Sequence, residues 1–245
     1  MSSTAHPEDH HPIPASTTAD VGVLYIVATP IGNLEDITLR ALRILGSVDV
    51  IAAEDTRHTR QLLTHHGLSR PLVSYHDHNE MGQAPRLLSM LQAGKSIALV
   101  TDAGTPGIAD PAYYLLQTLI PHAIPIVPIP GPTAAMAALT VSGLPMERFV
   151  FEGFLPVKSG RRRQRLAALV EETRTVVLYE SPHRLLRLLQ ELVEHMGPER
   201  RLVVARELTK RFEEVARGTT ATLLALFQTR TVRGEFTLVI GGSQS

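Results

Sequence analysis

Residues 97–111 read IALVTDAGTPGIADP, and this stretch decides how the rest of the chain is interpreted. Residues 97–100 are apolar and include two β-branched side chains, which predicts a short buried strand. Two glycines and a proline within residues 104–107 then predict a tight loop with freedom for close ligand approach. Asp110 and Pro111 predict the N-cap and first residue of a helix. A strand, a glycine-containing loop and a helix start are typical of the ligand-binding edge of an α/β sheet.

Length and composition restrict the possible classes of protein. The 245 residues suffice for one large α/β domain or two ordinary ones, and 44% hydrophobic content excludes wholesale disorder. The absence of cysteine excludes disulfides and thiolate chemistry. A net charge of zero and 4% aromatic residues argue against a stacking platform for single-stranded nucleic acid, although a local basic patch stays possible. No apolar run has membrane-spanning length, so we expect a cytoplasmic protein without a membrane partner.

The order of apolar and polar segments predicts two α/β domains with a ligand cleft between them. Residues 1–20 are polar and lack periodicity, so we expect a disordered leader. We assign residues 21–143 to an N-terminal α/β domain and residues 144–245 to a C-terminal one. The predicted strands are residues 21–28, 48–53, 72–75, 97–100, 124–129, 149–154, 175–179, 201–206 and 236–240, and residues 213–217 form an antiparallel hairpin with the strand at 201–206.

Three loops of the first domain share glycine, proline and small hydroxyl residues after predicted strands. They are residues 29–33, 102–110 and 131–134, and their free N–H groups suit a carboxylate or a phosphate. Neither a dinucleotide fingerprint nor a phosphate-binding loop is present, so a zwitterionic ligand with an apolar middle fits better than NAD or ATP. His76 and His78 are spaced like metal ligands, but no third ligand lies nearby in the sequence, and we expect no metal site.

Eight motifs follow one another along the chain: TPIGNLEDIT (29–38), AAEDTRHTRQLL (52–63), SYHDHNE (74–80), VTDAGTPGIADP (100–111), PGPTA (130–134), FEGFLP (151–156), LYESPHRL (178–185) and RELTKRFEE (206–214). Together they resemble the small-subunit ribosomal RNA 2′-O-methyltransferases of the tetrapyrrole methylase superfamily. The resemblance extends over almost all of residues 21–242. A single motif of this kind is weak, whereas eight in the same order are specific.

The resemblance implies S-adenosylmethionine bound between two α/β domains, a homodimer, and methylation of a cytidine 2′-hydroxyl in the decoding region of 16S rRNA. We expect the 30S subunit as the context of that rRNA, and the sequence does not decide whether free rRNA or the assembled subunit is the acceptor. It also implies a set of cofactor-binding residues: Thr29, Pro30, Ile31, Gly32, Asp102, Gly104, Thr105, Pro106, Gly107, Ile108, Ala109, Pro132, Thr133, Ala134, Leu178 and Tyr179. Family members often continue past the last strand with a helical segment. This chain stops three residues after Gly242, so we expect any RNA contact of that segment to be missing.

A ribose hydroxyl must lose its proton when it is methylated, and a carboxylate, lysine or histidine within hydrogen-bond reach would accept it. The candidates at the predicted cleft are Asp36, Glu54, Asp55, His76, Lys158 and Glu180. The sequence does not choose among them. For Glu54 and Asp55 the alternative is structural ion pairing with Arg57 or Arg60.

One sharp basic run stands out, made of Lys158, Arg161, Arg162, Arg163 and Arg165. It lies at a predicted helix start, where cations oppose the helix dipole, so local stability does not explain it. We interpret it as a phosphate-binding surface for RNA, which Lys210 and Arg211 extend.

Two other functions compete with RNA methylation. Methylation of a tetrapyrrole carbon by the same fold would favour an apolar, aromatic-lined trough, and the chain offers a basic run instead. A non-catalytic RNA-binding module of the small ribosomal subunit would have no need of three glycine-containing loops.

Overall fold

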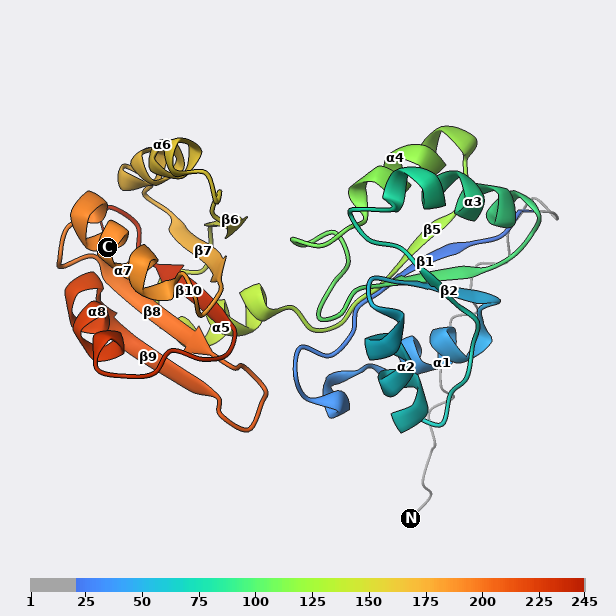
Figure 1. Cartoon of the computed structure of the whole chain (residues 1–245), viewed down its shortest axis with the longest axis horizontal. Helices are drawn as coiled ribbons and strands as arrows, with labels where there is room; N and C mark the ends of the chain where they lie inside the picture. Colours follow the sequence, from blue (N-terminus) through green and yellow to red (C-terminus); the bar gives the residue numbers. More distant parts are fainter. Residues whose placement is uncertain (1–20, 245) are drawn as a thin grey trace, which may run out of the picture.

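Two separate five-stranded sheets organise the computed structural model, which describes residues 21–244 (Figure 1). The expected disordered leader at residues 1–20 lies outside these residues. Within them, no helix combines the length and the apolarity needed to cross a membrane.

The first sheet is entirely parallel and has the strand order β3-β2-β4-β1-β5. Its strands are β1 (Leu24–Val27), β2 (Val50–Ala53), β3 (Leu72–Ser74), β4 (Ile97–Val100) and β5 (Ile126–Ile129). Parallel strands are covered on both faces, and β2 and β4 are accordingly buried along their whole length. β5 carries a proline and lies at the sheet edge, as its sequence predicts.

Helices cover both faces of the first sheet (Figure 1). α1 (Leu39–Ser47) and α2 (Thr56–His65) pack on one face, and α3 (Glu80–Gln92) and α4 (Tyr113–Leu119) pack on the other. Short 3₁₀ turns, η1 (Leu34–Asp36) and η2 (Ile120–His122), precede α1 and follow α4. Sheet and helices together form what we call the first lobe. Because its strands are all parallel, their carboxyl ends lie on the same side of the sheet.

The second sheet is mixed and has the order β6-β7-β10-β8-β9. Its strands are β6 (Phe149–Phe154), β7 (Thr175–Glu180), β8 (Arg201–Arg206), β9 (Glu214–Thr219) and β10 (Phe236–Ile240). β10 runs antiparallel to both of its neighbours, and β8 and β9 form the predicted antiparallel hairpin.

Side chains on the inner strands of the second sheet alternate between two cores. One core lies under α6 (Ser159–Val170), α7 (Leu185–Met196) and α8 (Thr220–Gln228). The other lies under α5 (Ala134–Ser142), whose small residues approach the sheet closely. Sheet and four helices form what we call the second lobe.

The packing of α5 bears on the predicted division of the chain. A boundary after residue 143 groups α5 with the first domain. The helix instead buries Ala135, Ala138 and Leu139 against the second sheet. The contacts of α5 thus favour a boundary before the helix, although residues 21–143 and 144–245 as domains remain a prediction.

Candidate active site

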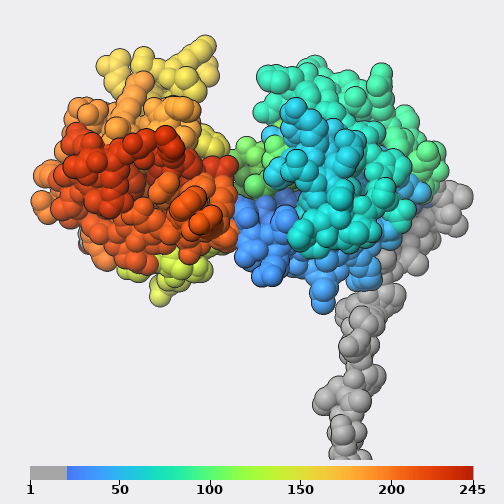
Figure 2. All heavy atoms as spheres, turned by 60° about the horizontal axis from the view of Figure 1, so that its bottom comes forward, coloured from blue at the N-terminus to red at the C-terminus, as the bar shows by residue number. Residues whose placement is uncertain are grey.

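A cavity of about 330 Å³ lies between the two lobes. The first lobe contributes loops that follow β1, β2, β4 and β5, because the carboxyl ends of parallel strands meet at one edge of a sheet. The second lobe contributes the ends of β6, β7 and β8 and the start of β10. Figure 2 shows a groove that separates the upper parts of the two lobes.

The cavity brings together nine of the sixteen residues predicted to hold the cofactor. They are Ile31, Asp102, Gly104, Thr105, Ile108, Ala109, Thr133, Ala134 and Tyr179. Thr29 and Pro30 line a smaller neighbouring cavity of about 110 Å³, which Asp102 also lines. Gly32, Pro106, Gly107 and Pro132 belong to the same loops but do not line the main cavity.

The side chain of Leu178 points away from the cavity, so only its main chain could contact a cofactor there. Successive residues of a strand point to opposite faces, and the Leu178 side chain is fully buried in the core under α6, α7 and α8. Tyr179 points the other way, lines the cavity, and accepts a hydrogen bond from the Ala135 N–H at 3.1 Å. The Tyr179 hydroxyl thus takes the capping role at α5 that the Thr133 side chain does not perform.

The charge of the cavity wall is one-sided. Five carboxylates line it, from Glu54, Asp102, Asp110, Glu180 and Glu235, and the lining includes no lysine or arginine. Apolar surface comes from both lobes, including Phe154, whose ring packs edge-on against Tyr179 at 5.6 Å between centroids. Such a wall favours a small cationic ligand with an apolar body.

Asp110 differs from our expectation of a helix N-cap. α4 begins at Tyr113 with Ala112 as its N-cap and no side-chain cap bond, so the predicted cap at Asp110 is wrong. Gly107 and Ala109 have φ of 86° and 80°, and these left-handed residues leave Asp110 at the cavity wall. Its position after the strand-end loop, at the same edge as Glu54 and Asp102, is the sequence signal that could have identified it.

The electrostatics of this wall raise two carboxyl pKa values. Burial, followed by the nearby charges of Glu54 and Asp102, raises the pKa of Asp110 to about 7. Burial also raises the pKa of Glu54, whose Oε2 accepts the Asp102 N–H at 3.3 Å. Of the six base candidates from the sequence, Glu54 is the one that lines the cavity without an ion-pair partner among the described residues.

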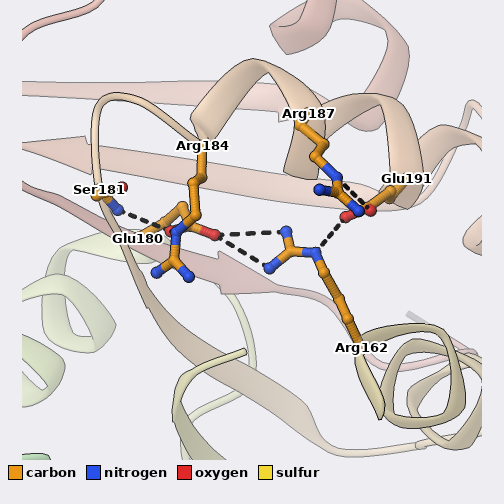
Figure 3. A network of polar contacts seen from close by, with 6 residues as sticks. All are labelled: Arg162, Glu180, Ser181, Arg184, Arg187 and Glu191. Atoms are coloured by element: carbon orange, nitrogen blue, oxygen red, sulfur yellow. Dashed lines mark hydrogen bonds and ion pairs between the residues drawn. The ribbon is translucent and has the colours of Figure 1, made fainter. Parts of the chain in front are cut away.

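Glu180 also lines the cavity, but its carboxylate is fully engaged (Figure 3). Arg162 Nη2 and Arg184 Nε contact it at 3.4 and 2.7 Å, and the Ser181 N–H donates to it at 2.8 Å. Both carboxylate oxygens therefore already have partners, and neither is open to a substrate hydroxyl. These contacts favour a structural role for Glu180 over that of a base.

Arg162 does not belong to the predicted RNA-binding surface. Its side chain is 2% exposed and bridges Glu180 to Glu191, whose Oε2 lies 2.6 Å from Arg162 Nε (Figure 3). It cannot contact an RNA phosphate from this position. The signal was present in the sequence, because Arg162 shares the buried stripe of α6 with Leu166 and Leu169 at helical spacing.

The remaining base candidates lie off the cavity wall. Asp55 is the N-cap of α2 and pairs with Arg57 at 2.8 Å, which lowers its pKa and confirms the structural alternative. Asp36 is exposed at the end of η1, and Lys158 is exposed at the N-cap of α6. His76 lies near enough to Glu54 to lower the pKa of that carboxyl, as the smallest of several effects.

The other basic residues expected to bind RNA differ in whether they are exposed and whether a carboxylate pairs with them. Within residues 21–244, Lys158, Arg161 and Arg163 are exposed and form no ion pair. Arg165 is held by Glu152, and Lys210 by two glutamates. Arg211 is exposed, with its guanidinium 5.5 Å from the centre of the Phe212 ring, which is itself 63% exposed. The free cations are therefore found at the start of α6 and at the loop between β8 and β9.

That β8–β9 loop also touches the first lobe. Glu207 and Thr209 have φ of 50° and 66°, an uncommon conformation for residues other than glycine. The turn places Lys210 so close to Gly32 that a Cβ at Gly32 would lie 2.3 Å from Lys210 Cγ. Glu207 and Glu235 hold the Lys210 ammonium at 3.0 and 2.9 Å.

Comparison with known proteins adds a family and relatives. Residues 23–224 match the family described as Tetrapyrrole (Corrin/Porphyrin) Methylases. The chain is 55% identical over 223 residues to ribosomal RNA small subunit methyltransferase I of Synechocystis sp., which covers 91% of this chain and 80% of that protein. It is 51% identical over 226 residues to the protein of the same name from Escherichia coli O157:H7, with 91% and 79% covered.

Solved structures share the fold at lower identity. The methyltransferase CobJ superposes with a TM-score of 0.69 at 20% identity, covering 90% of this chain and 94% of that one. Uroporphyrin-III C-methyltransferase from Thermus thermophilus, complexed with S-adenosylhomocysteine, gives a TM-score of 0.65 at 20% identity, with 91% and 99% covered. At these identities the similarity establishes the two-lobed architecture alone.

Proposed function

The chain belongs to the tetrapyrrole methylase family, within its ribosomal RNA small subunit methyltransferase I branch, and from this we propose that it methylates the ribose 2′-hydroxyl of a cytidine in the decoding region of 16S rRNA. It is an S-adenosylmethionine-dependent methyltransferase. The resemblance carried by the eight motifs is thereby confirmed. The observation that carries the proposal is about half identity, over nine tenths of the chain, to enzymes of one name.

The cavity between the lobes fits S-adenosylmethionine. The sulfonium and ammonium groups of this cofactor are cationic. They match the charge of a cavity wall that carries carboxylates and no lysine or arginine. Gly104 has a φ of 85° and lets the main chain after β4 approach a ligand, while Tyr179 and Phe154 close the opposite side. Bound there, the cofactor supplies an activated methyl group.

The residues of the chain then have two tasks in the reaction. The lobes must hold donor and acceptor in line, and this orientation supplies much of the rate of a displacement reaction. A group at the cavity must also take the proton of the hydroxyl. Glu54 remains the candidate from the sequence that meets the position requirement.

We place the RNA across the groove beside the cavity. Lys158, Arg161 and Arg163 on α6 and Arg211 on the β8–β9 loop offer unpaired cations from one lobe. Phosphate contacts of this kind position a polynucleotide without reading its sequence. We propose the assembled 30S subunit as the acceptor and the cytoplasm as the compartment. We also propose a homodimer as the active form, as the family resemblance implies.

Methylation of a tetrapyrrole carbon is the second candidate, because the solved structures of the same fold include such enzymes. Sequence identity favours RNA methylation over tetrapyrrole methylation. The chain is 20% identical to those solved structures and 51–55% identical to the ribosomal RNA enzymes, over similar shares of the chain. The cavity with its carboxylates and open glycine loops also argues against a non-catalytic RNA-binding module.

The test is a methyl-transfer assay with labelled S-adenosylmethionine and three acceptors: undermethylated 30S subunits, free 16S rRNA and a uroporphyrinogen. We expect label in the 30S subunits, and nuclease digestion should release it as 2′-O-methylcytidine. Label in the tetrapyrrole alone would favour the second candidate. Absence of label from every acceptor, with intact cofactor binding by calorimetry, would contradict both.

A further inference from the structure

The five carboxylates of the cavity wall differ in what holds them. Glu180 and Glu235 are ion-paired, with Arg162 and Lys210 among their partners. The cations occupy oxygens of these two carboxylates, so those oxygens are not open to a substrate hydroxyl.

Glu54 and Asp102 are engaged in a different way. Glu54 Oε2 accepts the Asp102 N–H at 3.3 Å, and Asp102 Oδ1 accepts the Asp55 N–H at 3.0 Å. These bonds tie the ends of β2 and β4 together and fix the two side chains as part of the loop framework.

Asp110 has neither kind of partner among residues 21–244. The Thr101 side chain is a hydrogen-bonding neighbour of its carboxyl and lowers the pKa of Asp110 against the larger effects of burial and the nearby carboxylates. Thr101 is 2% exposed, so this neighbour is shielded from solvent. Asp110 thus has a neutral neighbour, whereas Glu180 and Glu235 are paired with cations.

The backbone around Asp110 places its side chain at the cavity and does not use it to cap α4. Ala109 is held at a φ of 80°, and Ala112, not Asp110, precedes α4 as its N-cap. Left-handed conformations of residues other than glycine cost free energy and cluster at functional sites. Here Asp110 lines the cavity. Burial raises the pKa of Tyr179 of the other lobe, and Asp110 lies close enough to add to that rise as the smallest of its causes.

Three carboxylates act on Asp110 and raise its pKa. Glu54, Asp77 and Asp102 approach it from the loops after β2, β3 and β4, and Tyr179 approaches it from β7. Burial and these charges together bring its pKa to about 7, where a general base combines availability with driving force.

We propose that the Asp110 carboxylate accepts the proton of the acceptor hydroxyl during methyl transfer. The inference rests on the proposed function. In the step, the hydroxyl oxygen forms a bond to the methyl carbon, the carbon–sulfur bond breaks with its electron pair left on sulfur, and the O–H proton passes to an Asp110 Oδ. The thioether product is neutral at sulfur, and Asp110 returns its proton to water before the next turnover.

The test compares Asp110→Asn, Asp110→Glu and a matched Glu54→Gln variant with wild type in single-turnover assays on 30S subunits. Loss of a general base lowers the rate by about 10²–10⁴-fold. We expect that loss for D110N, partial recovery for D110E, and a smaller effect for E54Q. In wild type the rate should rise with pH through an inflection near the pKa of Asp110, and D110N should lack that inflection. The dissociation constant for S-adenosylhomocysteine, measured by calorimetry, should stay within a few-fold in D110N.

Three results would overturn the inference. They are a D110N rate within a few-fold of wild type, an unchanged pH profile in D110N, and a D110N defect that saturating cofactor abolishes, which would make Asp110 a binding group. If D110N does not fold, the pH dependence of the wild-type methyl-transfer rate becomes the deciding measurement. A rate that does not change with pH around neutrality contradicts the proposal. Wild type without any methyl transfer would instead contradict the proposed function.

Discussion

Arg162 illustrates how burial decides the role of a charged residue. A run of four arginines in five residues reads as a surface, yet one of them is 2% exposed and pairs with two glutamates (Figure 3). Arg161 and Arg163 flank it and are exposed. The helical period explains the difference, because residues 162, 166 and 169 share one face of α6.

Removal of this buried cation should destabilise the second lobe. In Arg162→Met, Glu180 loses one of its two cations while its side chain remains 0% exposed. Breaking a buried ion pair in this way costs about 3–5 kcal/mol. Denaturant unfolding should report that loss in free energy, whereas Arg163→Met, an exposed control, should stay within about 0.5 kcal/mol. Equal stability of the two variants would contradict the structural role of Arg162.

Asp110 predicts a pH dependence of stability. Its pKa is about 7 in the folded protein, against 3.8 for a free aspartate side chain in water. Below the lower value the carboxyl is neutral in both states and has no effect on stability. Above the higher value it is ionised in both states, and its burial in the fold then destabilises the protein. Stability should therefore fall as pH rises from about 4 to about 7 because of this group.

Asp110→Asn removes that destabilisation. The pKa difference corresponds to an upper limit of about 4 kcal/mol, and partial exposure reduces the expected gain to about 1–2 kcal/mol. Thermal unfolding should show D110N more stable than wild type at about pH 8 and equal to it at about pH 4. A constant difference at both pH values would show that the carboxyl does not titrate in this range.

Helices and strands were largely predictable because their burial is periodic. Continuous apolar runs indicated the inner strands of the first lobe, and β8–β9 was identified as an antiparallel hairpin. The sequence did not indicate α2, because its buried face has few apolar residues among many polar ones. The place of β10 between β7 and β8 was not predictable either, since an apolar strand fits any inner position of a sheet.

α6 carries a prediction about RNA. The double variant Arg161→Gln/Arg163→Gln removes two exposed cations and leaves the buried stripe of the helix intact. Each phosphate contact contributes about 0.7–0.9 to the slope of log K against log salt, so the slope should fall by about 1–2. Filter binding to the 30S subunit at several salt concentrations measures this, with S-adenosylhomocysteine affinity as the control. An unchanged slope would place the RNA elsewhere on the protein.

At the scale of the whole molecule, the lobes meet at the cavity and at the contact of Gly32 with Lys210. Two α/β units were predictable from the alternation of elements along the chain. The way they face each other was not, because that contact depends on the left-handed turn at Glu207 and Thr209, which nothing in a β-hairpin pattern indicates. The sequence analysis did not identify Leu208 and Glu235 as residues of the cavity wall, because this turn could not be foreseen.

Gly32→Ala tests the interlobe contact. Its Cβ would lie 2.3 Å from Lys210 Cγ, so either the Lys210 side chain, which two glutamates hold, or the lobes must shift. We expect a loss of about 1–3 kcal/mol in stability from overpacking, and a lower rate of methyl transfer because the reacting groups are no longer in line. Gly82→Ala in α3 is the control, since nothing lies within 4 Å of its added carbon. Equal rates for G32A and wild type would show that the contact does not set the lobe geometry.

Each sheet is built from one uninterrupted part of the polypeptide, residues 24–129 for the first and 149–240 for the second. During synthesis the first sheet can therefore assemble while the second has not yet left the ribosome, since none of its strand pairings involves later residues. α5 is the exception, because the strands it covers are all made after it. We expect its small apolar face to stay uncovered in the nascent protein, available to chaperones, until the last strand arrives.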